Sequence, residues 1–121
     1  DAQPAVDLTR FTRLERPTPK LNTTIGVIAT DAPLTKAHLK RVAMTGHDGI
    51  ARAVRPAHSP LDGDTLFAVS TPAPGEQPVS DVEVLGRIGE AAAEAVQAAI
   101  VDAVVHATGA VGVSAWRDLA R

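Results

Sequence analysis

Two short runs of apolar and β-branched residues have the composition of buried strands, and they constrain this chain more than any other feature. Thr23–Thr30 has the sequence Thr-Thr-Ile-Gly-Val-Ile-Ala-Thr, and Thr65–Ser70 has Thr-Leu-Phe-Ala-Val-Ser. An almost continuously apolar strand is typical of a sheet that is covered on both faces. Two strands do not make a stable sheet alone. We therefore expect the remaining strands to come from another segment or another chain.

A helix is predicted after each strand. Thr35 can cap the first helix, which ends by Pro56. Ser80–Glu83 has the form of a capping box for a long second helix, which we expect Gly109 to stop. The inward positions expected from helical spacing are Leu39, Val42, Ala43, Ile50 and Val54, then Val82, Leu85, Ile88, Ala92, Val96, Ile100 and Val104. This order of elements indicates a layered unit of the α+β or α/β class.

The chain has few large side chains from which to build a core. Its 121 residues include two Phe, one Trp and no Tyr, which leaves the core to Ala, Val, Ile and Leu. Apolar burial contributes roughly 25 cal/mol per Å², so small side chains contribute little each. A chain of this length normally makes one domain. We expect this one to be part of something larger.

Charge and composition exclude several classes of function. With 12 basic and 14 acidic residues the formal charge is −2, so nucleic acid and anionic membranes are not expected partners. The longest apolar stretch, 91–107, contains charged residues and is shorter than the roughly 20 residues of a membrane span. The absence of Cys excludes disulfides and thiol catalysis. No secretory signal is expected near Asp1, and a soluble, cytoplasmic protein fits these features.

Four histidines are the first candidates for chemistry, but their spacing is uninformative. No two of them have the i, i+4 spacing of a helical zinc pair, so we expect no metal site. His47 with Asp48, and His58 with Ser59, supply pieces of a Ser-His-Asp set without the elbow that exposes a serine. Histidines at the surface or packed on a helix are the favoured interpretation. The four are His38, His47, His58 and His106.

Asp62 and Asp64 flank a glycine immediately before the second strand. If extended backbone begins there, both carboxylates point to one face and can grip a cation. An Asp-Gly turn with solvated acids is the alternative. Asn22-Thr23 at the head of the first strand has a further property: a Thr hydroxyl beside a free α-amino group is a nucleophile with its own base. That chemistry requires the Asn22–Thr23 bond to be cut.

Three segments in order resemble the C-terminal part of the DmpA-type autoprocessing aminopeptidases, which include β-peptidyl aminopeptidases and nylon-oligomer hydrolases. The segments are Leu21–Thr35, His47–His58 and Asp62–Val69, within a similarity that extends from about Leu21 to Arg121. In that family a precursor cleaves itself before a Ser or Thr, and the new first residue of the small subunit is the nucleophile. The matching bond here is Asn22–Thr23.

The resemblance implies a fold and a set of partners. Residues 1–22 would be the tail of a large N-terminal subunit or a linker, and residues 23–121 the small catalytic subunit. The implied fold is α+β, part of a layered αββα sandwich that resembles N-terminal-nucleophile hydrolases but has the connectivity of the DmpA and ornithine-acetyltransferase type. The large subunit would complete the sheet and supply the oxyanion donor, and the assembly is expected to be a multimer of both subunits.

The resemblance also implies the reaction. Thr23 attacks the carbonyl of a peptide or amide substrate without metal or cofactor, and Asp62 and Asp64 hold the new α-amino group, which relays the proton. Removal of an N-terminal residue is the expected activity. Cleavage within synthetic amide oligomers is an alternative, as is a non-catalytic subunit that never cleaves. Acyl transfer of the ornithine-acetyltransferase type fits less well, because residues 22–26 lack the processing sequence associated with it.

Overall fold

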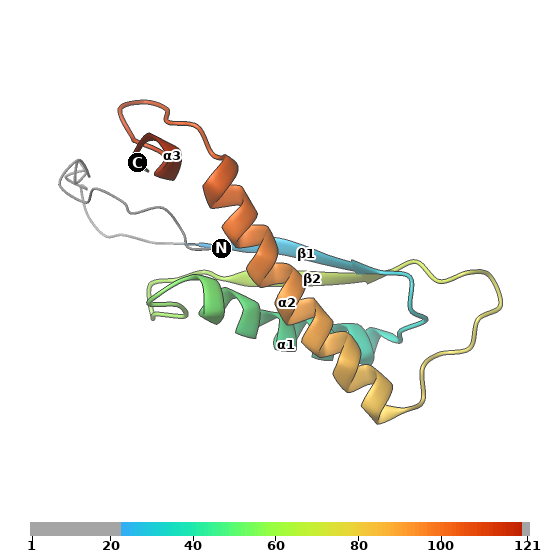
Figure 1. Ribbon diagram of the computed structural model, residues 1–121. Helices are drawn as coiled ribbons and strands as arrows, with labels where there is room; N and C mark the ends of the chain where they lie inside the picture. Colours follow the sequence, from blue (N-terminus) through green and yellow to red (C-terminus); the bar gives the residue numbers. More distant parts are fainter. Residues whose placement is uncertain (1–22, 120–121) are drawn as a thin grey trace.

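The computed structural model describes residues 23–119, so the predictions for residues 1–22, Asn22 included, lie outside the described residues. Along the chain come β1 (Ile25–Thr30), α1 (Lys36–Ala53), β2 (Thr65–Ser70), α2 (Val82–His106) and the short α3 (Trp116–Leu119) (Figure 1). The order strand, helix, strand, helix is the one that the sequence predicts. The described residues therefore form an α+β unit with a small parallel sheet.

The two strands pair in parallel, with α1 as the crossover between them. Ile25 lies opposite Thr65, and the register continues to Thr30 opposite Ser70. The ladder extends beyond the strands, because the Thr65 N–H donates to the Thr24 carbonyl at 2.8 Å and the Thr71 N–H donates to that of Thr30 at 2.9 Å. The segments that precede β1 and β2 consequently lie at the same edge of the sheet.

The helix ends follow local side-chain chemistry. The predicted cap of α1 is confirmed, since Thr35 Oγ1 accepts the His38 N–H at 3.2 Å. The predicted capping box of α2 is wrong by one residue: Asp81 is the cap, and its Oδ1 accepts the Glu83 N–H at 2.8 Å. A carboxylate at this place also interacts favourably with the positive end of the helix. The predicted stop at Gly109 is wrong as well, because Ala107 already has extended backbone.

The core lies between one face of the sheet and the two long helices. Ile28, Val42 and Ala92 bring β1, α1 and α2 into one buried cluster. The helices approach closely at Gly49, where a Cβ would overlap the Ala93 carbonyl oxygen. Among the helices in residues 23–119, none has the length and apolarity that a membrane span requires.

Three of the predicted inward positions are wrong. Val54, Val82 and Val104 are exposed. Val54 follows the last residue of α1, and the other two lie near the ends of α2. Helical spacing identifies the inward face of a helix but not the length over which a neighbour covers it.

The opposite face of the sheet is bare within residues 23–119. Ile25 is 71 % exposed and Phe67 is 59 % exposed, and Val27 and Val69 on the same face are exposed too. The expectation of a sheet covered on both faces is thus met on the helical face alone. Two strands that present four large apolar side chains to solvent form a surface of the kind that associates with other protein.

Candidate active site

The candidate site lies where the two parallel strands begin. Thr23 and Thr24 lead into β1, and residues 62–64 lead into β2. Because parallel strands start at the same edge, the register that pairs Ile25 with Thr65 brings these two segments side by side. Figure 1 shows the two strands starting at the same end of the sheet. The topology thus joins two motifs that are about 40 residues apart in the sequence.

Asp64 is the best-connected side chain of this edge. Its Oδ1 accepts the Thr24 N–H at 3.0 Å, and its Oδ2 accepts from His58 Nδ1 at 2.8 Å. Only 9 % of the side chain is exposed. Burial acts to raise the pKa of the Asp64 carboxyl, but hydrogen bonds from Thr24 and the contact with His58 outweigh it and lower that pKa below its ordinary value. Asp64 is therefore ionised at neutral pH.

The Thr23 side chain lies against Gly63, between the two aspartates. A Cβ built at Gly63 would stand 2.8 Å from Thr23 Oγ1 and 3.6 Å from Thr23 Cγ2. A contact of 2.8 Å is shorter than van der Waals packing allows, so the hydroxyl can take this place because position 63 has no side chain. The sequence reasoning assigned no role to Gly63 beyond a turn. Thr23 itself is exposed to solvent.

Asp62 has different partners from Asp64. Its Oδ2 accepts the Ser59 N–H at 2.7 Å, and its own N–H donates to the Ser59 carbonyl at 2.9 Å. This carboxylate therefore closes the loop before β2, while Asp64 reaches across to β1. The two acids are brought to one edge, yet no group of three or more potential metal ligands gathers anywhere in residues 23–119. The role expected for Asp62 at the α-amino group stays a prediction.

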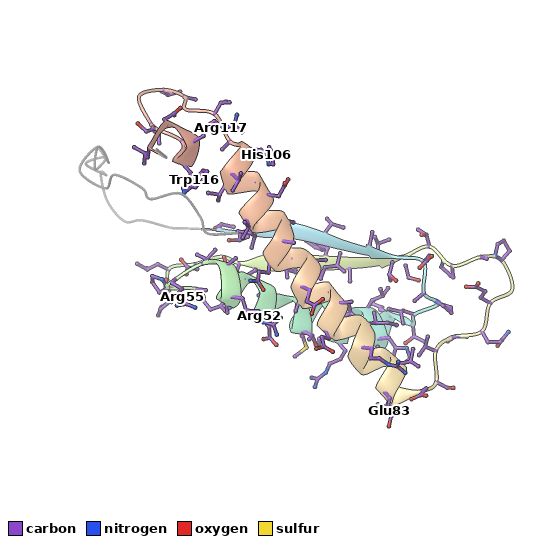
Figure 2. All side chains as sticks on the ribbon, viewed as in Figure 1. Arg52, Arg55, Glu83, His106, Trp116 and Arg117 are labelled. Carbon is purple, nitrogen blue, oxygen red and sulfur yellow. The ribbon has the colours of Figure 1, made fainter. Side chains whose placement is uncertain are left out.

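His58 is exposed, as expected for a surface histidine, and it also contacts Asp64, with its Nε2 3.3 Å from the His47 carbonyl oxygen. The sequence pattern did not predict this contact. The His47 and His58 rings lie 5.1 Å apart between centroids. The signal in the sequence was its place at the end of the motif His47–His58, just before the two aspartates. The other such pair, His106 with Asp102, is near the C-terminal end of α2, close to Trp116 and Arg117 (Figure 2).

This edge thus combines the Thr23 side-chain hydroxyl, the half-buried, ionised Asp64 carboxylate and the His58 imidazole. Such a set can orient an attacking hydroxyl and hold a cationic group. Comparison with known proteins shows which family the chain belongs to. The family model of peptidase family S58 matches residues 3–117. The chain belongs to peptidase family S58.

Similar proteins named as aminopeptidases and as an amide-oligomer hydrolase agree with this family. The chain is 40 % identical over 131 residues to an uncharacterized aminopeptidase of Mycobacterium tuberculosis, which covers 98 % of this chain and 38 % of the relative. It is 42 % identical over 114 residues to one of Mycobacterium leprae, over 88 % of this chain and 32 % of the relative. A 6-aminohexanoate-oligomer endohydrolase of Kocuria sp. is 42 % identical over 50 residues, 41 % of this chain and 14 % of that enzyme.

The S58 chain spans less than two fifths of the length of the curated aminopeptidases that it matches. The predicted resemblance to the DmpA-type family is confirmed by the family match. The residues that carry the activity are a separate question, because the relatives' names do not specify them. The roles of Thr23, Asp62 and Asp64 stay predictions.

Proposed function

We propose that this chain contains the catalytic nucleophile of a self-cleaving amide hydrolase, and that Thr23 is that nucleophile. One observation carries the proposal: Thr23 Oγ1 lies against Gly63, and the Asp64 carboxylate binds the N–H of the next residue, Thr24. If the start of β1 had no chemical role, it would require neither a glycine at position 63 nor an ionised, half-buried acid at position 64. Membership of a peptidase family supports the same conclusion.

In the proposed first step the Thr23 hydroxyl attacks the carbonyl carbon of Asn22. The C–N bond of that peptide breaks and the nitrogen of Thr23 takes up the hydroxyl proton, which leaves a free α-amino group and an ester between Asn22 and Thr23 Oγ1. Water then hydrolyses this ester, releasing the Asn22 carboxylate and restoring the Thr23 hydroxyl. This amine then serves as the base for Thr23 in the mature enzyme. It accepts the hydroxyl proton during attack on a substrate amide and passes the proton to the leaving amine, and water releases the acyl group.

Asp64 would orient the new amine. Its Oδ1 already faces the backbone at the start of β1, and an ionised carboxylate close to an ammonium group holds it by charge and hydrogen bonding. Asp62 would contribute the second acid of the pair from the loop before β2. No metal or cofactor is required by this sequence of steps.

The exposed face of the sheet supports the proposal that a second subunit packs against it. We expect the remainder of the same precursor, as a large N-terminal subunit, to cover Ile25, Val27, Phe67 and Val69 and so complete an αββα sandwich. The exposure of these four apolar residues supports this, as does the length of the relatives beyond the matched part. Subunits joined in this way would form the multimer that the family resemblance implies.

Two substrate classes follow from the relatives. The two mycobacterial relatives are named as aminopeptidases, which favours removal of an N-terminal residue from a peptide. The endohydrolase names match a shorter part of the chain and make cleavage within synthetic amide oligomers the second candidate. Measuring the hydrolysis of aminoacyl anilides and of 6-aminohexanoate oligomers by the enzyme distinguishes the two substrate classes.

The test is the intact mass of the protein made from the full-length gene, followed by N-terminal sequencing of any small fragment. We expect a fragment that begins Thr-Thr-Ile-Gly and that co-elutes with the large fragment in size-exclusion chromatography. The Thr23→Ala protein should stay uncut. An uncut wild-type chain would favour the non-catalytic alternative, and fragments that separate would contradict the shared sandwich.

A further inference from the structure

We infer that His58 is a positioning residue of this site: it holds the Asp64 carboxylate in the orientation that reaches the Thr23–Thr24 segment. The inference rests on the proposed function of Thr23. It concerns a residue outside the nucleophile and the two acids, and it is supported by two contacts of the His58 ring and by the backbone conformation of His58.

The first contact fixes the carboxylate. With Oδ2 bound to His58 Nδ1 at 2.8 Å, the two oxygens of Asp64 are no longer interchangeable, and Oδ1 is left for the Thr24 N–H at 3.0 Å. A carboxylate without the first partner can rotate about its terminal torsion, which is broad for aspartate. His58 thus selects the Asp64 rotamer in which Oδ1 accepts the Thr24 N–H at the start of β1.

The second contact fixes the imidazole. His58 Nε2 is 3.3 Å from the His47 carbonyl oxygen, and a carbonyl can only accept. The Asp64 carboxylate can also only accept, so both ring nitrogens of His58 face acceptors. Both ring nitrogens are engaged, which fixes the orientation of the imidazole between the two acceptors. Within residues 23–119, His58 is the side chain in ion-pair contact with Asp64, and the His47 ring lies beside it.

The third observation is the backbone of His58, which has a φ of 57°. Residues other than glycine seldom adopt this left-handed conformation, and Asn tolerates it better than most. His is also among the residues that adopt it more often than most, so the loop can hold His58 in this conformation with its ring between His47 and Asp64. The same preference supplies a conservative variant, because Asn fits the backbone and carries an N–H donor near the place of Nδ1.

The experiment compares His58→Ala and His58→Asn in the full-length precursor by following the cut at Asn22–Thr23 with intact mass. We expect His58→Ala to slow cleavage about tenfold and His58→Asn to stay within about threefold of wild type, as for the loss and retention of one charge-assisted hydrogen bond. Because 39 % of the His58 side chain is exposed, added imidazole can enter the vacated space, and it should accelerate the His58→Ala precursor. The matched control is His106→Ala, which removes a solvent-exposed His–Asp contact on α2 that does not involve Asp64.

The outcomes separate the two proposals. Cleavage in Thr23→Ala would overturn the proposed function and this inference with it. If Thr23→Ala stays uncut while His58→Ala cleaves at the wild-type rate, the inference alone is overturned. It is also overturned if His58→Ala and His58→Asn are equally slow, melt at lower temperature than wild type and do not respond to imidazole, because His58 would then serve the fold alone.

Discussion

Two His–Asp pairs occur in residues 23–119, and they show how little a contact distance reveals about a role. His58 Nδ1 is 2.8 Å from Asp64 Oδ2, and His106 Nδ1 is 3.0 Å from Asp102 Oδ1. In the first pair the acid is 9 % exposed and its second oxygen binds Thr24. In the second pair the side chains are 68 % and 74 % exposed, one helical turn apart on α2.

The difference lies in what each pair connects. The His106–Asp102 pair joins residues four apart on a single helix, and solvated pairs of this kind contribute a few tenths of a kcal/mol at most. The His58–Asp64 pair lies within the loop between α1 and β2, and Asp64 connects that loop to the start of β1 through the Thr24 N–H. Burial and long-range connection, rather than distance, distinguish the pair beside the proposed nucleophile.

The largest effect is expected for Asp64→Asn. The amide lacks the charge that holds an ammonium group, and its NH2 would face an N–H of His58 if its oxygen kept the Thr24 bond. We expect cleavage at Asn22–Thr23 to slow about a hundredfold, as for loss of one preorganised electrostatic group. The measurement is the cleavage rate of the full-length precursor by intact mass. Asp102→Asn should cleave like wild type, and equal rates in the two variants would remove the distinction between the pairs.

The sequence was sufficient to predict β1, α1, β2 and α2, whereas the short α3 was not predicted. Apolar runs located β1 and β2, and Thr35 located the start of α1, because these features are local. The exposed ends of α2 could not be predicted, since coverage of Val82 and Val104 depends on where another helix crosses. The bare face of the sheet was anticipated only in part, by the argument that two strands are too few.

The site divides in the same way between local and distant causes. Thr23 and Asp64 were singled out by chemistry and by family resemblance, and the parallel register brings their segments together. The contacts of His58 and Gly63 were not predicted. They depend on how the loop between α1 and β2 folds back toward β1, and hydrophobic periodicity carries no information about the path of a loop. His58 has no other histidine at the i, i+4 spacing that marks a helical pair, and a glycine between two aspartates is already explained by a turn.

A smaller effect is expected for Gly63→Ala, which changes the surroundings of the His58–Asp64 pair but neither of its two residues. The new Cβ would stand 2.8 Å from Thr23 Oγ1, and the stiff threonine side chain would have to rotate away. We expect cleavage to slow about tenfold, with little change in melting temperature, because displacement of a reacting group is costly. Gly86→Ala is the matched control, since a Cβ there meets no atom within 4 Å. Wild-type cleavage by Gly63→Ala would show that Thr23 reacts from another position.

The smallest effect is a dependence of stability on pH. The pKa of Asp64 lies below its ordinary value of 3.8 in the folded protein, so the unfolded chain binds this proton more readily. Ionised Asp64 therefore stabilises the fold above pH 3.8, and this contribution is lost as the pH falls below that value toward the folded pKa. We expect the melting temperature of Thr23→Ala, which stays uncut, to exceed that of Thr23→Ala with Asp64→Asn at about pH 6 by more than at about pH 3. With Asp102→Asn in place of Asp64→Asn, the difference should be small at both values, because that carboxylate is solvated. A difference in melting temperature that is as large at about pH 3 as at about pH 6 would mean that Asn disturbs packing at position 64. The His58–Asp64 pair would then resemble the exposed His106–Asp102 pair in its electrostatics.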